Sequence, residues 1–432
     1  MFPTRALALV LITLLVAACG SGSPDPDRGQ DPGGACARTL AGEVTMPTRL
    51  APTGGECDYL LSGTLYVTSE LRIDPGTTIV AAPASRIYVQ DGGRIVASGT
   101  PTQRIEFVGS VATLGSWYGV CFSGDHLESR LDNVDIYWAG AVFSAGSHVC
   151  RAALGSVSEG GEPVHVTDSL IVGAYTSGID ATRFTLGEFR GNVLAGHREY
   201  GMRVSANNMG RLDATTNFGG TGVTYPDGSS AANGKPYVAL APSTLDIVDA
   251  EGEYQQWVPV DVPYHLTSDD LPYSGDALSL DEGSRTVIAP GTRFVMAPGT
   301  LVIVEWGAAL GLDGTAEAPV RFDSEAPGPG RWEGFWMYGG GLLADHAVFT
   351  GAGNSEGLIT RGAITFDRVY GPSHCSHIKN LTVSGSLAHG VVITEDHEGL
   401  VRVDGATFED VAGTGIVGAN SGPAVLDGAP CV

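Results

Sequence analysis

One carboxylate and one guanidinium stand at matched positions of the sequence, and together they could move a proton. Asp180 and Arg203 directly follow the pairs Gly178-Ile179 and Gly201-Met202, which lie 23 residues apart. If the chain coils with that spacing, the two side chains stack on adjacent coils. A basic residue beside an acid can abstract a proton, so Asp180 and Arg203 are the catalytic candidates. We favour the other interpretation, a cross-coil ion pair that contributes under ~1 kcal/mol if exposed.

A short acidic segment near the C-terminus could hold a cation. TEDHEG, residues 394 to 399, places Glu395, Asp396 and Glu398 around a histidine. Calcium accepts clustered carboxylate oxygens, so these three residues are the metal candidates and calcium is the cofactor that they would suit. We favour a solvated acidic turn instead, and we expect no cofactor.

Other polar clusters offer less. HCSH, residues 374 to 377, has a spacing that would let histidine nitrogens converge on zinc, but its cysteine fits a disulfide better. No Ser-His-Asp order, phosphate loop or nucleotide fingerprint is visible. Two further basic residues are expected beside acids: Arg130 by Asp125 and Glu128, and Lys379 by Asp367.

Six of the seven cysteines follow the leader: Cys36, Cys57, Cys121, Cys150, Cys375 and Cys431. An even number in an oxidising compartment predicts disulfide bonds, although six cysteines allow 15 pairings. Closeness along the chain favours Cys36–Cys57 and Cys121–Cys150, which leaves Cys375–Cys431. No C-x-x-C pair is present to favour the alternative, a zinc site.

The first 19 residues have the parts of an export signal. Arg5 supplies a positive charge, and residues 6 to 18 are apolar except for Thr13. That run is too short for a hydrocarbon core of ~30 Å. LVAAC, which ends at Cys19, resembles the bacterial lipobox, and this resemblance implies that the cysteine is acylated and becomes the mature N-terminus. The alternative is a plain secretory signal with an incidental cysteine.

Residues 20 to 35, GSGSPDPDRGQDPGGA, cannot bury enough apolar surface to become ordered, so they predict a flexible tether. Two or more acyl chains hold a protein stably on a membrane. The membrane is therefore an expected partner, and a bacterial outer-membrane lipoprotein, periplasmic or surface-exposed, is the expected location.

The charge of the chain restricts its partners. Acidic residues number 48 against 24 basic ones, which gives a formal net charge of −24. This excess argues against binding to nucleic acid and against electrostatic attraction to anionic lipid. It fits an exported body, which we expect to be a monomer.

One pattern occurs twice. LRIDPGTTIVAAP at 71 to 83 returns as TVIAPGTRFVMAP at 286 to 298, and Pro75 to Pro290 is a shift of 215 because 290 − 75 = 215. The same shift carries Trp117 to Trp332. We therefore predict two homologous copies, residues 36–225 and 226–432, joined by a segment rich in turn residues.

Within each copy, short runs such as RIYVQ, RIVAS and RIEFV alternate apolar and polar residues, which is typical of half-buried strands. Together with the run IAPGT…VIVEWGAALGLDGTAEAPVRF…GRWEGFWM, they make the body resemble the right-handed parallel β-helix domains of bacterial surface lipoproteins. The resemblance implies an all-β solenoid of the pectate-lyase-like kind, in which each coil covers the next. We expect Trp117 and Trp332 to lie in its core.

Function follows less directly from the sequence. A complete scaffold without a visible catalytic constellation favours a non-catalytic binding or structural module for a glycan or a surface protein. The alternative is a polysaccharide lyase or glycoside hydrolase, assisted by calcium in the lyase case, which would need acids and a base on one outer face.

Overall fold

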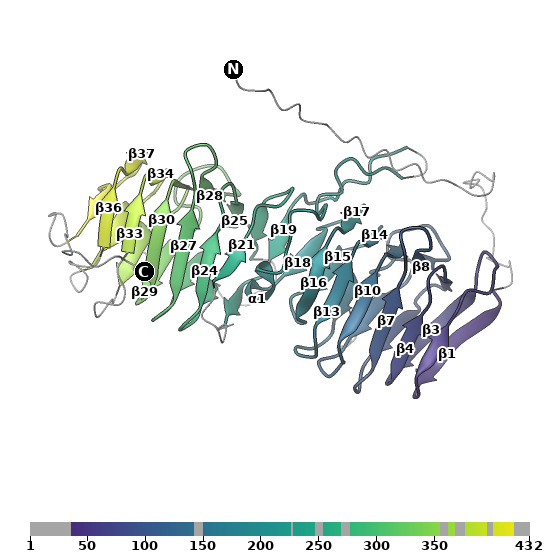
Figure 1. Cartoon of the computed structure of the whole chain (residues 1–432). Helices are drawn as coiled ribbons and strands as arrows, with labels where there is room; N and C mark the ends of the chain where they lie inside the picture. Colours follow the sequence, from purple (N-terminus) through teal and green to yellow (C-terminus); the bar gives the residue numbers. More distant parts are fainter. Residues whose placement is uncertain are drawn as a thin grey trace, which may run out of the picture. The chain divides into compact units, whose positions relative to one another are not determined.

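The computed structural model describes residues 36–141, 150–225, 228–246, 254–268, 277–354, 362–367, 376–394 and 401–418. They form 38 strands and one four-residue helix, α1 (Ala206–Met209). Paired strands run parallel, and Figure 1 shows the strands of successive coils side by side. The predicted parallel β-helix is confirmed. Within the described ranges, no helix is long and apolar enough to cross a membrane.

The alternating pattern explains why these residues coil. In β5 (Thr78–Ala81) and β6 (Arg86–Val89) every second residue is buried, so one face of each strand points into the coil. Glycines turn the chain between strands: Gly76 and Gly92 have φ of 79° and 76°, which side chains rarely allow. Apolar alternation and glycine corners together close each turn around an apolar interior.

Three ladders of parallel strands carry the N-terminal half. The first comprises the beginnings of β1 (Arg38–Val44) and β3 (Tyr59–Val67), then β5, β8 (Ile105–Gly109), β11 (Val134–Tyr137), β14 (Leu170–Val172) and β17 (Val193–Ala195). The second comprises the ends of β1 and β3, then β6, β9 (Gly119–Phe122), β12 (Ala152–Ser156), β15 (Ser177–Ala181) and β18 (Met202–Val204). The third comprises β2 (Thr48–Leu50), β4 (Glu70–Ile73), β7 (Arg94–Ser98), β10 (Ser129–Asp132), β13 (Val164–Thr167) and β16 (Leu186–Arg190).

The second ladder runs on into the C-terminal half. It continues through β19 (Val238–Leu240), β22 (Tyr264–Leu266), β25 (Arg293–Met296), β28 (Val320–Ser324), β31 (Ala347–Thr350), β34 (Thr382–Ser384) and β37 (Thr407–Glu409). The fourth ladder comprises β20 (Ser243–Leu245), β23 (Ala277–Leu280), β26 (Leu301–Val304), β29 (Gly334–Tyr338), β32 (Gly362–Asp367), β35 (His389–Ile393) and β38 (Ile416–Val417). The fifth comprises β21 (Gln255–Trp257), β24 (Arg285–Ile288), β27 (Ala309–Asp313), β30 (Gly341–Asp345), β33 (Ser376–Lys379) and β36 (Val401–Asp404).

Like residues stack on one another in the core. Along the second ladder Phe322 lies between Phe294 and Phe349, with ring centroids 4.9 and 5.0 Å apart. Trp117 and Trp332 are fully buried as expected, and their indole N–H groups donate to backbone carbonyls at 2.9 and 3.0 Å. One buried apolar cluster spans both halves, so each coil depends on its neighbours.

Positions related by the 215-residue shift have matching local structure. Strands β5 to β8 begin at 78, 86, 94 and 105, and β25 to β28 begin at 293, 301, 309 and 320. Gly119 and Gly334 both have positive φ, 97° and 110°. These matches support our proposal of two homologous copies.

The matched strands belong to different ladders. β5 pairs with β3 and β8 in the first ladder, whereas β25 pairs with β22 and thereby extends the second. Equivalent surfaces of the two halves are therefore displaced by one face of the coil.

The turn-rich junction packs against the N-terminal half. Val223, Tyr225 and Ala231 contact the outer surface of the first ladder at Val172 and Ala195. The Tyr225 ring stacks on Trp138 at 5.6 Å, and its hydroxyl donates to the carbonyl oxygen of Gly196 at 3.1 Å. The junction therefore covers an apolar strip of the first ladder.

Candidate functional site

Asp180 and Arg203 are register partners on β15 and β18, so the structure brings them to adjacent coils of the second ladder. The Asp180 carboxylate accepts hydrogen bonds from the Thr182 backbone N–H and hydroxyl, at 3.2 and 2.6 Å. Gly155 and Ala239 occupy the next places in this outward column. A catalytic role for the pair remains a prediction.

The same outward column reaches a polar cluster that sequence reasoning missed. His265 follows Ala239 in register and lies buried beside Tyr200 and Tyr237, with ring centroids 6.2 and 5.0 Å away. Its Nε2 lies 3.5 Å from a carboxylate oxygen of Glu325. Nothing in the sequence links these residues, because they come from four separate coils and turns.

The outer surface of the first ladder carries two carboxylates in register, Glu106 on β8 and Asp135 on β11. Arg104 lies beside them, and its Nε donates to Asp135 Oδ1 at 2.7 Å. Asp135 is buried and Glu106 half-buried. The second outward place in each strand, RIEFV and VDIY, could have revealed the pair, but only with the correct register between coils.

Burial governs the acid–base behaviour of this pair. Loss of solvent raises the pKa of Glu106, and the neighbouring Asp135 charge raises it further. Burial also raises the pKa of Asp135, against the opposing hydrogen bond from Arg104. Two adjacent carboxyl groups with raised pKa values can hold a proton, which is what a general acid requires.

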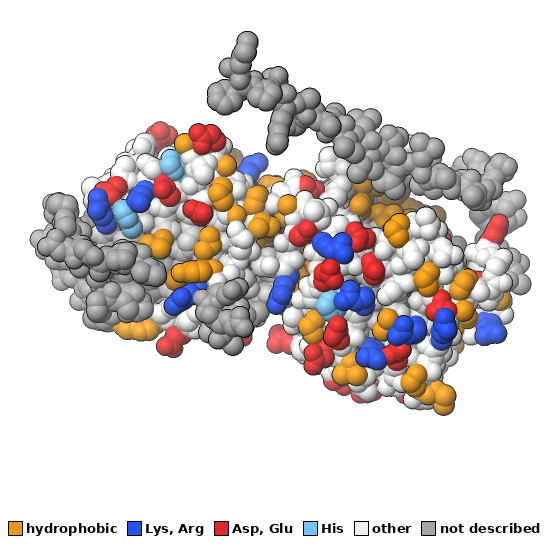
Figure 2. Space-filling view, in the orientation of Figure 1, with side chains coloured by type: hydrophobic (Ala, Val, Ile, Leu, Met, Phe, Trp, Pro, Cys, Tyr) orange, Lys and Arg blue, Asp and Glu red, His pale blue; other side chains and the backbone are white. Residues whose placement is uncertain are grey.

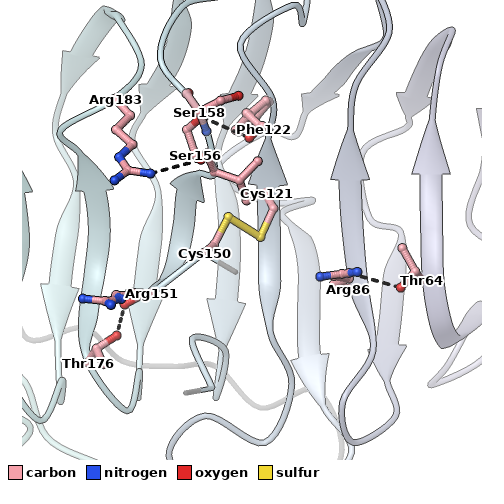
Figure 3. Close-up of a disulfide and its surroundings, with 11 residues drawn as sticks. Thr64, Arg86, Cys121, Phe122, Cys150, Arg151, Ser156, Ser158, Thr176 and Arg183 are labelled. Atoms are coloured by element: carbon pink, nitrogen blue, oxygen red, sulfur yellow. Dashed lines mark hydrogen bonds between the residues drawn. A yellow bond between two sulfur atoms is a disulfide. The ribbon is translucent and has the colours of Figure 1, made fainter. Parts of the chain in front are cut away.

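Two of the expected disulfides are confirmed. Cys36–Cys57 and Cys121–Cys150 have Cα–Cα distances of 4.7 and 5.8 Å. Figure 3 shows the second bridge, which joins β9 to the residue preceding β12. Near it, Arg183 donates to the Val157 carbonyl oxygen at 3.1 Å. The bridge therefore ties adjacent strands of the second ladder.

Several candidates lie outside the described residues: Cys19, Glu395, Asp396, Glu398, Cys375 and Cys431. Among the described residues, no group of three or more His, Cys, Asp or Glu side chains could hold a metal ion. His377, from HCSH, has its Nε2 2.8 Å from an Asp404 carboxylate oxygen.

Two expected neighbours are wrong. Arg130 Nη1 donates to Glu188 at 3.3 Å, because β13 brings the third ladder forward to β16, and Glu128 instead contacts His165. Lys379 lies in register with Asp345 and Asp404 on the fifth ladder, whereas Asp367 ends β32 on the fourth. Acids close in sequence were separated by the corners of the coil.

Comparisons with known proteins give little more. No family model matches the chain, and no curated protein matches it. One solved structure that resembles it is the surface adhesin PfbA of Streptococcus pneumoniae, with 11% identity over 86% of this chain and 88% of that chain and a TM-score of 0.33. The fold assignment rests on the strand pairing described above.

Proposed function

We propose that this chain is a lipid-anchored protein of the bacterial cell envelope whose β-helix binds a glycan or a surface protein without catalysis. Acylated Cys19 would hold it in the outer membrane, and residues 20–35 would serve as a tether. The leader and the lipobox resemblance support the anchor. The outer faces of the coil support the binding role.

The observation that carries the binding role is the regular placement of outward side chains. On the third ladder Arg49, Arg72, Val96, Arg130 and His165 occupy one column on successive coils. Adjacent strands lie ~4.8 Å apart, so such a column repeats at fixed spacing. Figure 2 shows basic and acidic side chains interspersed over the area of β4, β7, β10 and β13. A rigid surface with repeated contacts suits a linear or extended partner.

A cell-surface test separates the anchor from the binding role. In bacteria fed an alkyne fatty acid, the full-length chain should be labelled and should sediment with membranes, and Cys19→Ala should lose both properties. Detergent-solubilised full-length chain should then bind members of a glycan array or retain a surface protein. Labelling that persists in Cys19→Ala would remove the anchor, and binding to neither class would remove the binding role.

Glu106 and Asp135 favour one second candidate, a glycoside hydrolase. Carboxyl groups on neighbouring coils with a raised pKa could act as acid and base on a glycosidic bond. Release of reducing ends from a polysaccharide panel, lost in Glu106→Gln, would support it. Release that is unchanged in Glu106→Gln would exclude this pair.

A further inference from the structure

The outer surface of the fourth ladder carries a group of aromatic residues. On β29, Phe335 and Met337 point inward and are fully buried, so Trp336 and Tyr338 point outward. The rings of Trp336 and Tyr338 lie 4.8 Å apart at 48°. They form a continuous aromatic surface rather than two isolated rings.

Trp306 adds a third ring from the turn after β26. Its indole lies against Gly339, where an added Cβ would come 2.5 Å from Trp306 Cε3. Glycine at this position therefore makes room for the ring, and 39% of Trp306 remains exposed. Because one side of the indole rests on backbone, the exposed part can receive a flat apolar ligand surface.

The fold does not require aromatic residues here. Subtracting 215 from Trp306, Trp336 and Tyr338 leads to Asp91, Cys121 and Ser123 in the N-terminal half. Those residues stand at the end of β6, in β9 and just after it, so an equivalent pair of strands forms without them. Core packing therefore does not explain the three rings.

Polar groups at the same surface match the hydroxyl groups of a sugar. The Trp336 indole N–H is buried and has no hydrogen-bond acceptor. The Glu305 carboxylate, next to Trp306, has only a 3.5 Å contact with the Ser279 hydroxyl, and Asp367 is in register with Tyr338. A sugar hydroxyl can accept from an indole N–H and donate to a carboxylate, whereas a purely apolar partner would leave both unsatisfied.

We propose that Trp306, Trp336 and Tyr338, with Glu305, form a binding site for a pyranose glycan on the outer surface of β26 and β29. The apolar C–H face of the sugar ring packs on the indoles, and its hydroxyls pair with the Trp336 N–H and the Glu305 carboxylate. This inference rests on the proposed binding function and names its ligand class and its place.

The test measures binding of cellohexaose, chitohexaose and hexagalacturonate to the detergent-solubilised full-length chain, by calorimetry and by tryptophan fluorescence. At least one of these probes should bind and shift the emission. Trp306→Ala and Trp336→Ala should each weaken that probe about tenfold or more. Trp336→Phe keeps a ring but removes the N–H, and should weaken it less. The matched control is Leu343→Ala on the fifth ladder, equally exposed at 39%, which should leave binding unchanged.

The outcomes separate the site from the function. If the wild-type chain binds a probe and both alanine variants, shown folded by circular dichroism, bind it equally well, the site is wrong while glycan binding stands. If the wild-type chain binds no probe, the site fails for these ligands whatever the glycan array gives. If the tryptophan variants only abolish self-association of the chain, the surface is a contact between copies and the proposal is overturned.

Discussion

Glu106 is a half-buried carboxyl group that faces a second carboxyl group, Asp135, on the next coil. Burial, then the Asp135 charge, raises the folded-state pKa of Glu106 above its unfolded value. Below the unfolded pKa both states are protonated and folding has no cost from this group. As the pH rises through the raised folded pKa, the folded protein must ionise a buried acid, so its stability falls.

We therefore expect Glu106→Gln to stabilise the protein near neutral pH. The gain should be no more than about 1 kcal/mol, because solvent still reaches the carboxyl group, and it should vanish in acid. Urea unfolding between pH 4 and pH 8 measures it. Glu70→Gln is the opposite control, since the Arg94 hydrogen bond lowers the pKa of Glu70, and that variant should lose stability at neutral pH. A Glu106→Gln curve parallel to the wild type would contradict the prediction.

His197 predicts a second pH dependence, at the acidic end. It is fully buried, its Nδ1 accepts from the Ala174 N–H at 3.1 Å, and burial lowers its pKa to about 3. Below the ordinary histidine pKa the unfolded chain takes up a proton that the folded chain refuses. Stability should therefore fall by up to about 1.4 kcal/mol per pH unit from roughly pH 6.5 toward pH 3 on account of this group.

Replacing His197 by Gln should remove that share of the slope, whatever it does to stability at neutral pH. Unfolding free energies measured at several pH values for both proteins give the two slopes. Equal slopes would show that His197 is protonated in the folded protein.

At the scale of single elements, the Cys121–Cys150 bridge ties β9 to the start of β12 across 29 residues of sequence. Closing a loop of that length restricts the unfolded chain, so the double variant Cys121→Ser and Cys150→Ser should lose about 3 kcal/mol of stability. Denaturant unfolding of the oxidised proteins measures the loss. The prediction fails if the variant unfolds at the same denaturant concentration as the wild type.

The strands were predictable where one copy explains the other. Alternation in RIYVQ and RIVAS and the repeated Trp117 and Trp332 were enough to predict parallel coils around an apolar core. Glu106 and Asp135 were not found, because their meeting depends on which residues of successive coils align. Turns of different length set that alignment: Glu106 and Asp135 lie 29 residues apart, whereas Asp180 and Arg203 lie 23 apart. Trp336 escaped notice because it alternates with the inward Phe335 and Met337 in one aromatic run.

At the scale of the whole molecule, the junction belongs to the folded body rather than standing between two bodies. Asn233, beyond the predicted boundary at residue 225, is buried and donates from Nδ2 to the carbonyl oxygens of Leu194 and Phe218, at 2.8 and 2.6 Å. It also accepts from the His197 backbone N–H at 2.9 Å. A cut at residue 225 would remove these contacts.

A fragment that ends at residue 225 should therefore be less soluble and more sensitive to protease than one that ends at residue 240. The longer fragment keeps Asn233 and Ala231 over the first ladder. Soluble yield and limited proteolysis of the two fragments test this. Equal behaviour would mean that the junction adds nothing to the N-terminal half.

The displacement of matched strands by one ladder has an evolutionary consequence. If the chain arose by duplication, the second half was rotated about the coil axis relative to its parent as it was added. Any ancestral contact surface then pointed in a new direction, where its old partner no longer reached it. Selection was free to rebuild that surface, and three aromatic rings now stand where the parent keeps an acid, a disulfide and a serine.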